Sequence, residues 1–238
     1  MCGRLNITDD PWVTQILLDF GIENPYEPRH LGRFIRATQE ISIVLEEKVK
    51  ATTGPMTQRR VQSAAWWLLQ EATANGFQPS RYTSFNSRYD KLFVPSSAAY
   101  HPFQSSRCII IANGFGETQE TGKVKRYFDF RTAHEPILFA GLYRIWQHTH
   151  QHAPFYSCSI ITLPPHPKLQ CYHDKASPMM LPNDRDLIDA WLDPDFHHVE
   201  AFRPLLMPSL YQPLWVQEVD KPSTYQPIGA EHCIPSDN

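Results

Sequence analysis

The feature that most constrains the fold is a series of short apolar runs of strand type, separated by polar and proline-rich segments. These runs lie at 41–45, 107–112, 125–130, 137–143 and 156–162. Runs of this length that are rich in β-branched and aromatic residues predict buried strands. Few long helical patterns interrupt them, so we expect an α+β fold with a mostly antiparallel, barrel-like sheet and peripheral helices.

Length and proline usage fit one domain. The chain has 238 residues, of which 42% are hydrophobic, and it holds 21 Pro against 10 Gly. Scattered prolines predict many rigid connections between short elements. No internal repeat or low-complexity linker divides the chain, so we expect a single domain over 1–238, with a tail from about residue 221.

Two segments carry helix signals. The first starts at Pro11, with Thr8 or Asp9 as its N-cap, and ends before Gly21. The second is capped by Asn183 or Asp184 and continues through Leu192. We also expect a hairpin-type connection at 51–60 and a last strand around Val216.

Net charge and the length of the apolar runs constrain the cellular location of the protein and the kind of ligand that it could bind. The formal net charge is −3, so any site for a polyanion must be local. No apolar run approaches the roughly 20 residues of a membrane span, and the start of the chain has no signal pattern. We therefore expect a cytoplasmic protein without membrane contact.

Cysteine and histidine patterns predict no metal centre. The five Cys are odd in number and form no CxxC pair, which indicates neither a disulfide framework nor a zinc knuckle. His148, His150 and His152 alternate on an expected loop without an acidic or Cys partner, which favours a solvated turn. We expect neither a metal nor another cofactor.

The start of the chain, Met1-Cys2-Gly3-Arg4, offers unusual chemistry. Removal of Met1 would give Cys2 a free α-amine and a thiol on adjacent carbons. The amine, with a pKa of about 8, can attack an aldehyde, and the thiol can then close a thiazolidine ring. Gly3 permits close approach of the backbone, and Arg4 suits phosphate. Position alone favours an ordinary mobile terminus over a reactive one.

Further polar and aromatic candidates follow along the chain. Trp66 and Trp67 could fill the core or stack on an unpaired base. Asn86 and Arg88 share one face of an extended segment. Glu117 is expected just beyond the end of the buried run at 107–112, where a catalytic carboxylate or an ordinary loop residue would both fit. His173 lies in a polar cluster, although isolated His-Asp pairs are common.

Taken in order, these motifs resemble the SRAP family, the SOS-response-associated peptidase fold whose members crosslink to abasic sites in single-stranded DNA. The similarity covers residues 1 to about 220 and rests on Met1-Cys2-Gly3-Arg4, 85–88, 113–117, 139–142 and 173–178. It implies Cys2 as nucleophile, Asn86 as a residue that orients the terminus or the sugar, Glu117 as acid/base and His173 as a second acid/base. It also implies DNA contacts at Gly3, Arg4, Trp66, Trp67, Arg88, Ser177 and Pro178.

The chain departs from the family pattern at several places. Phe34-Ile35-Arg36-Ala37-Thr38-Gln39 replaces an Asn-x-Ala-Pro-Thr run that follows an aromatic. Trp67 stands where a Gly follows the family Trp, Gly116 replaces an aromatic, and Lys175 replaces an Arg. These departures affect the expected shape of the DNA groove. The set of Cys2, Asn86, Glu117 and His173 remains complete.

Three functions compete at this stage. The leading hypothesis is a monomeric protein that crosslinks through Cys2 to abasic single-stranded DNA after autocatalytic removal of Met1. A cysteine peptidase acting on other proteins would use Cys2, His173 and Glu117. A non-covalent binding module for single-stranded DNA would use only the Arg and Trp side chains, and the negative net charge disfavours it.

Overall fold

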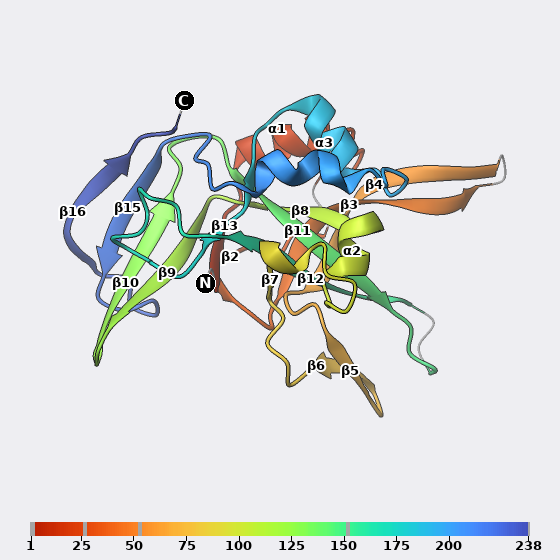
Figure 1. The fold of residues 1–238 in the computed structure, drawn as a ribbon, viewed down its shortest axis with the longest axis horizontal. Helices are drawn as coiled ribbons and strands as arrows, with labels where there is room; N and C mark the ends of the chain where they lie inside the picture. The colour runs from red at the N-terminus through yellow and green to blue at the C-terminus, as the bar shows by residue number, and fades with distance from the viewer. Residues whose placement is uncertain (1–2, 26–27, 52–53, 151–152, 238) are drawn as a thin grey trace.

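A computed structural model of the chain describes residues 3–25, 28–51, 54–150 and 153–237. Met1, Cys2 and His152 lie outside the described residues. Two large sheets form the body, with helices on one side of the larger sheet and a small hairpin projecting below it (Figure 1). The expected α+β class is confirmed, and most strand pairs are antiparallel.

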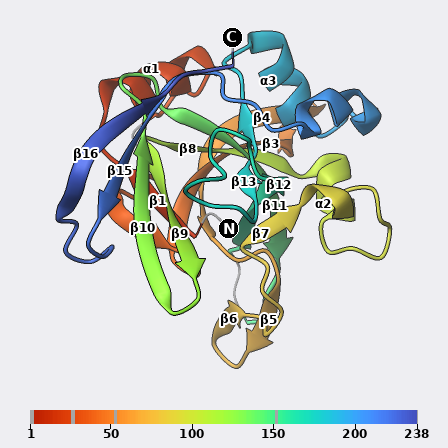
Figure 2. The same ribbon diagram turned by 60° about the vertical axis from the view of Figure 1, so that its left-hand side comes forward.

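The six-stranded sheet holds the start and the end of the described chain. Its strand order is β16-β15-β10-β9-β1-β2. In Figure 2 this sheet occupies the left of the molecule, with β16 as the outer strand. The strands are β1 (Arg4–Ile7), β2 (Gly32–Arg36), β9 (Gly114–Thr121), β10 (Val124–Arg131), β15 (Leu214–Val219) and β16 (Pro227–Ile234).

The larger sheet closes on itself. Strand β12 pairs with β11, and the path β11-β8-β3-β4 returns to β12 through one parallel pair, Ser157 with Ala65. This closure makes the expected barrel-like sheet. The strands are β3 (Glu40–Ala51), β4 (Gly54–Ala65), β7 (Asn86–Arg88), β8 (Arg107–Ala112), β11 (Ile137–Trp146), β12 (Phe155–Leu163), β13 (Ser177–Pro178) and β14 (Met180–Leu181).

Short elements surround the sheets. In Figure 1, α1 and α3 lie together above the larger sheet. None of the described helices is long and apolar enough to span a membrane. The remaining elements are α1 (Pro11–Asp19), α2 (Tyr100–Ser105), α3 (Arg185–Leu192), the 3₁₀ helices η1 (Tyr89–Lys91) and η2 (Val199–Leu206), and the hairpin β5 (Gln70–Thr73) with β6 (Gly76–Pro79).

Central strands bury both faces, which explains their continuous apolar runs. Ile43 and Ile110 point into a core shared by the two sheets. Their neighbours Val44 and Ile109 point to the opposite face, under the helices. Alternation therefore places successive apolar residues in two separate cores.

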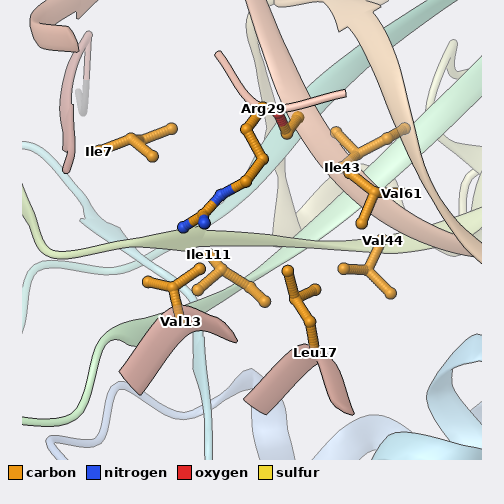
Figure 3. Close-up of a pocket in the computed structure, with 9 residues that line it drawn as sticks. Ile7, Val13, Leu17, Arg29, Ile43, Val44, Val61 and Ile111 are labelled. Carbon is orange, nitrogen blue, oxygen red and sulfur yellow. The ribbon is translucent and has the colours of Figure 1, made fainter. Parts of the chain in front are cut away.

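A small cavity lies in the second core, between α1 and the strands (Figure 3). It measures about 30 Å³ and is lined mainly by aliphatic side chains, Val13, Leu17 and Ile111 among them. Arg29 extends into this region, and its Nη1 donates to Asp9 Oδ1 at 3.1 Å. This bond ties the loop before β2 to the segment that leads into α1.

Several local predictions need correction. The N-cap of α1 is Asp10, whose side chain accepts from the amide of Trp12, instead of Thr8 or Asp9. The segment 51–60 is mostly strand β4, because β3 and β4 form a longer hairpin than expected. Val216 does lie in a strand, but β16 follows it. The Asp184 cap of α3 is confirmed.

Gly114 provides a test of the pairing of β9 with β10. A Cβ at this position would lie 2.2 Å from the backbone oxygen of Phe130, which cannot move without breaking the sheet. We predict that Gly114→Ala lowers the free energy of unfolding by about 2–3 kcal/mol. Urea denaturation measures the change. Gly32→Ala is the matched control, because its Cβ would meet only the flexible side chain of Ile35, and equal losses in both variants would contradict the prediction.

Candidate functional site

The first strand lies inside a sheet instead of at a free edge. Strand β1 pairs with β2 on one side and with β9 on the other, and all of its residues are buried. Arg4 lies opposite Gly116 on β9 and opposite Arg36 on β2. Gly3, half-buried, is the described residue that precedes this strand. The pairing fixes the start of the chain beside Glu117.

Arg4 lies over Gly116. A Cβ at Gly116 would come within 2.6 Å of the Arg4 side chain, so the glycine makes room for the guanidinium. Nη2 of Arg4 donates to the backbone oxygen of Glu117 at 2.8 Å and to that of Phe128 at 3.3 Å. Arg4 is therefore a buried cation that holds β9 and β10, in contrast to the exposed phosphate ligand expected from the sequence.

Glu117 and His173 form the chemical centre of the site. Glu117 belongs to β9, and its side chain points to the face of the sheet opposite Arg4, where only 4% of the residue is exposed. The Nδ1 of His173 lies 3.6 Å from Glu117 Oε2 and 3.1 Å from the backbone oxygen of Thr118. Since a carbonyl only accepts, Nδ1 carries the hydrogen and Nε2 is the basic nitrogen of neutral His173.

The environment tunes both groups for proton transfer near neutral pH. Burial raises the pKa of Glu117 to about 7, and the nearby charge of Arg4 opposes the rise. Burial lowers the pKa of His173 below its ordinary value, while the hydrogen bond to Thr118 opposes that shift. Near pH 7 the site therefore offers a carboxyl that is partly protonated and a neutral imidazole, a combination suited to acid/base catalysis.

The loop that carries His173 is anchored to the six-stranded sheet. Gln119 Nε2 donates to the backbone oxygen of Cys171 at 2.7 Å. The Tyr172 ring packs against Phe128 and Phe130, with ring centroids 5.1 and 5.7 Å apart. Figure 1 shows this loop in front of β9 and β10 before it enters β13. These contacts explain how a residue far along the sequence reaches Glu117.

Asn86 and Arg88 line a groove in the other sheet. Strand β7 pairs in parallel with β12, which places Asn86 opposite Ile160. The groove has a volume of about 610 Å³ and is also lined by Tyr82, Lys91 and Ser97. The Arg88 side chain is 67% exposed and pairs with Asp90 at 2.9 Å. Unlike Arg4, it is exposed, and a phosphate would reach it by displacing Asp90.

The two tryptophans have different environments. Trp66 is 0% exposed, and its Nε1 donates to the backbone oxygen of Phe85 at 2.9 Å. The ring therefore fills the core, one of the two uses expected from the sequence, and its contact with a base stays a prediction. Trp67 is half-buried, and its ring lies 5.7 Å from that of Phe85. Only the second indole offers an accessible surface.

Ser177 and Pro178 are buried instead of facing a ligand. The Ser177 hydroxyl accepts from the amide of His166 at 2.8 Å. Pro178 lies in β13, opposite Thr162 of β12. Their predicted DNA contacts are not supported by this arrangement, because both residues fix the path of the chain around the His173 loop.

Sequence reasoning missed the supporting residues of the site. The backbone oxygen of Thr118 sets the tautomer of His173, and Gln119 and Tyr172 hold the loop. Side chains alternate between the two faces of a strand, so a strand continuing past Phe115 would have placed Glu117 on the core face. No local sequence pattern predicts the contacts that hold the loop. No three Cys, His, Asp or Glu side chains gather as metal ligands among the described residues.

Comparison with known proteins identifies the family. The model of the SOS response associated peptidase (SRAP) family matches residues 1–222. The chain belongs to the SRAP family. Two relatives from Bacillus subtilis (strain 168) are abasic site processing protein YoaM, 26% identical over 213 residues, and abasic site processing protein YoqW, 26% identical over 214 residues. The alignments cover 87% of this chain and 86% and 87% of those proteins.

Solved structures share the SRAP fold of this chain. A Bacteroides thetaiotaomicron protein superposes with a TM-score of 0.67 at 18% identity, covering 92% of this chain and 93% of that protein. A Bordetella bronchiseptica protein superposes with a TM-score of 0.65 at 14% identity, covering 93% and 100%. The predicted family and fold are thus confirmed.

The raised pKa of Glu117 predicts an unusual pH dependence of stability. Between its ordinary value near 4.5 and about 7, the unfolded chain loses the Glu117 proton while the folded protein keeps it. Stability should therefore fall as pH rises through this window. Glu117→Gln removes the penalty, so the variant should gain on the order of 3 kcal/mol relative to the wild type between pH 4.5 and 8.

Urea denaturation across that pH range measures the gain, with the same N-terminus verified in both proteins by intact mass. Glu120→Gln is the matched control on the same strand. Its ion pair with Lys125 lowers the pKa of Glu120, so the contribution of Glu120 changes only below its ordinary value of 4.5, and the difference between this variant and the wild type should stay constant between pH 4.5 and 8. A Glu117→Gln difference that does not change with pH would contradict the prediction.

Proposed function

We propose that the protein processes abasic sites in single-stranded DNA by forming a covalent bond through Cys2 after removal of Met1. The observation that carries the proposal is the buried Glu117–His173 pair at the start of β1. Arg4 pairs with Gly116, the neighbour of Glu117 in β9, and Cys2 precedes Arg4 by two residues in the sequence. Acid/base groups and an aminothiol are the parts that aldehyde capture requires.

The proposed steps conserve atoms. Hydrolysis of the Met1–Cys2 peptide bond consumes one water and frees the α-amine. The neutral amine then attacks the aldehyde carbon of the opened abasic sugar, giving a carbinolamine. Protonated Glu117 donates to the departing hydroxyl, so that water leaves and an imine forms. The Cys2 sulfur adds to the imine carbon, its proton moves to the nitrogen, and a thiazolidine results.

His173 serves as the second acid/base in this proposal. Its Nε2 can accept the thiol proton, because Nδ1 is committed to Thr118 and the lowered pKa keeps the imidazole neutral. In the reverse direction the protonated ring would return a proton to sulfur as the thiazolidine opens. The Nδ1 hydrogen also faces Glu117 Oε2, which couples the protonation of the two side chains.

The names of relatives and the accessible groove support DNA with abasic sites as the substrate. The Bacillus subtilis relatives are abasic site processing proteins. Arg88 and Lys91 offer cations along the groove, and Asn86, the first residue of β7, lines the same groove. Contacts of this kind hold the backbone of a strand without reading its sequence. We propose that Asn86 orients the sugar and that the protein acts as a monomer.

Intact-mass measurement tests the proposal directly. The wild type should lack Met1, and after incubation with an abasic single-stranded oligonucleotide it should gain a heat-stable adduct. Cys2→Ala should form no stable adduct, since the remaining amine can give only a reversible imine. Cys233→Ala, which removes an exposed cysteine in β16, is the matched control and should react like the wild type.

A stable adduct on Cys2→Ala would refute the thiazolidine. The pH profile adds an independent check. Adduct formation should decline above about pH 7 as Glu117 loses its proton, and Glu117→Gln should react slowly without that decline. Equal rates for wild type and Glu117→Gln across the range would rule out the acid role of Glu117.

A further inference from the structure

A cluster of two aromatic rings and an arginine lies beside the first strand. The guanidinium carbon of Arg33 lies 3.0 Å from the centre of the Tyr225 ring. The Phe34 ring lies 5.3 Å from Tyr225, and Arg33 is also 5.6 Å from the Phe34 ring. Arg33 is exposed, and both rings are half-buried. We call Arg33, Phe34 and Tyr225 the ledge.

The two rings of the ledge come from distant parts of the chain. Phe34 belongs to β2, whereas Tyr225 lies in the turn between β15 and β16, after the part matched by the SRAP family model. Both have positive φ, 68° and 54°, a conformation that bulky side chains rarely adopt. Such backbone strain persists only where surrounding contacts enforce it, and it is frequent at ligand sites.

Buried polar bonds hold the ledge in place. The Tyr225 hydroxyl donates to Asp129 Oδ2 at 2.5 Å. Asn6 Nδ2 donates to both oxygens of the same carboxylate, at 2.8 and 3.1 Å. The backbone amide of Phe34 donates to Asn6 Oδ1 at 3.0 Å. This chain of bonds links both rings to β1, the strand that leads from the proposed nucleophile.

The ledge lies on the outer face of the six-stranded sheet. Leu5, Ile35 and Phe115 point into the shared core, so Arg4, Asn6 and Asp129 point the other way. Asn6 follows Arg4 by two residues, about 7 Å along the strand. The ledge, which is bonded to Asn6, therefore lies about two residues along the strand from Arg4 at the start of β1.

Arg36 supplies a cation between the ledge and the start of the chain. It lies opposite Arg4 in the register of β1 with β2 and is exposed. Among the described residues no carboxylate comes within ion-pair distance of Arg33 or Arg36. An accessible charge beside a pair of half-buried aromatic rings matches a phosphate followed by a base.

We propose that the ledge stacks an unpaired base of single-stranded DNA and that Arg36 contacts the phosphate between this base and the lesion. The inference rests on the proposed function for the position of the lesion. Stacking on rings and a guanidinium tolerates any base, so the ledge would add affinity for the strand without sequence preference.

Binding of a stable abasic analogue tests the ledge without covalent chemistry. The probe is a short single-stranded oligonucleotide with a tetrahydrofuran site, which has no aldehyde, and 2-aminopurine on one side of it. Tyr225→Phe keeps the ring but loses the hydroxyl bond to Asp129, so 2-aminopurine should still be quenched and affinity should fall less than in Tyr225→Leu. Tyr225→Leu removes the ring, so affinity should fall about tenfold and quenching should be lost.

The charge of Arg36 is tested by salt dependence. Arg36→Gln should weaken binding and reduce the slope of log affinity against log salt by about 0.7, the value for one phosphate on a single strand. Arg203→Gln is the matched control, because this exposed arginine lies in η2, and its slope should equal that of the wild type.

Equal losses for Tyr225→Phe and Tyr225→Leu, or wild-type binding by Tyr225→Leu and Arg36→Gln, would overturn the proposal. If Tyr225→Leu does not fold by circular dichroism, Phe34→Leu takes its place, with the same expected loss of quenching. The covalent reaction is scored separately on an aldehyde-bearing strand. Failure of the wild type to form an adduct, with ledge variants still weaker on the analogue, would refute only the proposed chemistry.

Discussion

The position of β1 between β9 and β2 is the constraint on which the site depends. An N-terminal strand at a sheet edge would fray, whereas β1 is buried and paired on both sides. Arg4 completes this arrangement by filling the space over Gly116 and bonding the carbonyls of Glu117 and Phe128. The same side chain that fixes the terminus therefore also fixes the backbone of the acid/base residue.

Arg4 also contributes to the electrostatics of two buried carboxyls on opposite faces of one sheet. Burial raises the pKa of Glu117 and of Asp129, and the charge of Arg4 opposes the rise at both. The two carboxyls differ in their hydrogen-bond partners. Asp129 accepts from Asn6 and Tyr225, which suits a structural anion, whereas Glu117 faces His173. Arg4 thus acts on the structural carboxyl of Asp129 and on the carboxyl of Glu117, for which we propose a chemical role.

Sequence patterns predicted the strands well and the site only partly. Apolar runs with both faces buried, such as 107–112, fold as expected. Glu117 was expected beyond a strand end because Gly114 and Gly116 suggest a turn, but the glycines lie inside β9, where the Phe130 carbonyl and Arg4 exclude a side chain. The Trp66 ring has no exposed face for stacking because it is part of the core. Contacts between segments far apart, like that of Phe34 with Tyr225, leave no local pattern.

Charge pairing explains how a chain with net charge −3 can offer a local site for a polyanion. Several exposed arginines are neutralised by bidentate partners, as Arg126 is by Glu218 and Arg131 by Glu231. Such pairs attract a phosphate weakly, because binding must first break them. Arg36 carries no such partner among the described residues and lies opposite Arg4 in the sheet. The positive charge of Arg36 therefore acts close to the start of β1. A negative net charge of the whole protein does not prevent this local region from binding a DNA strand.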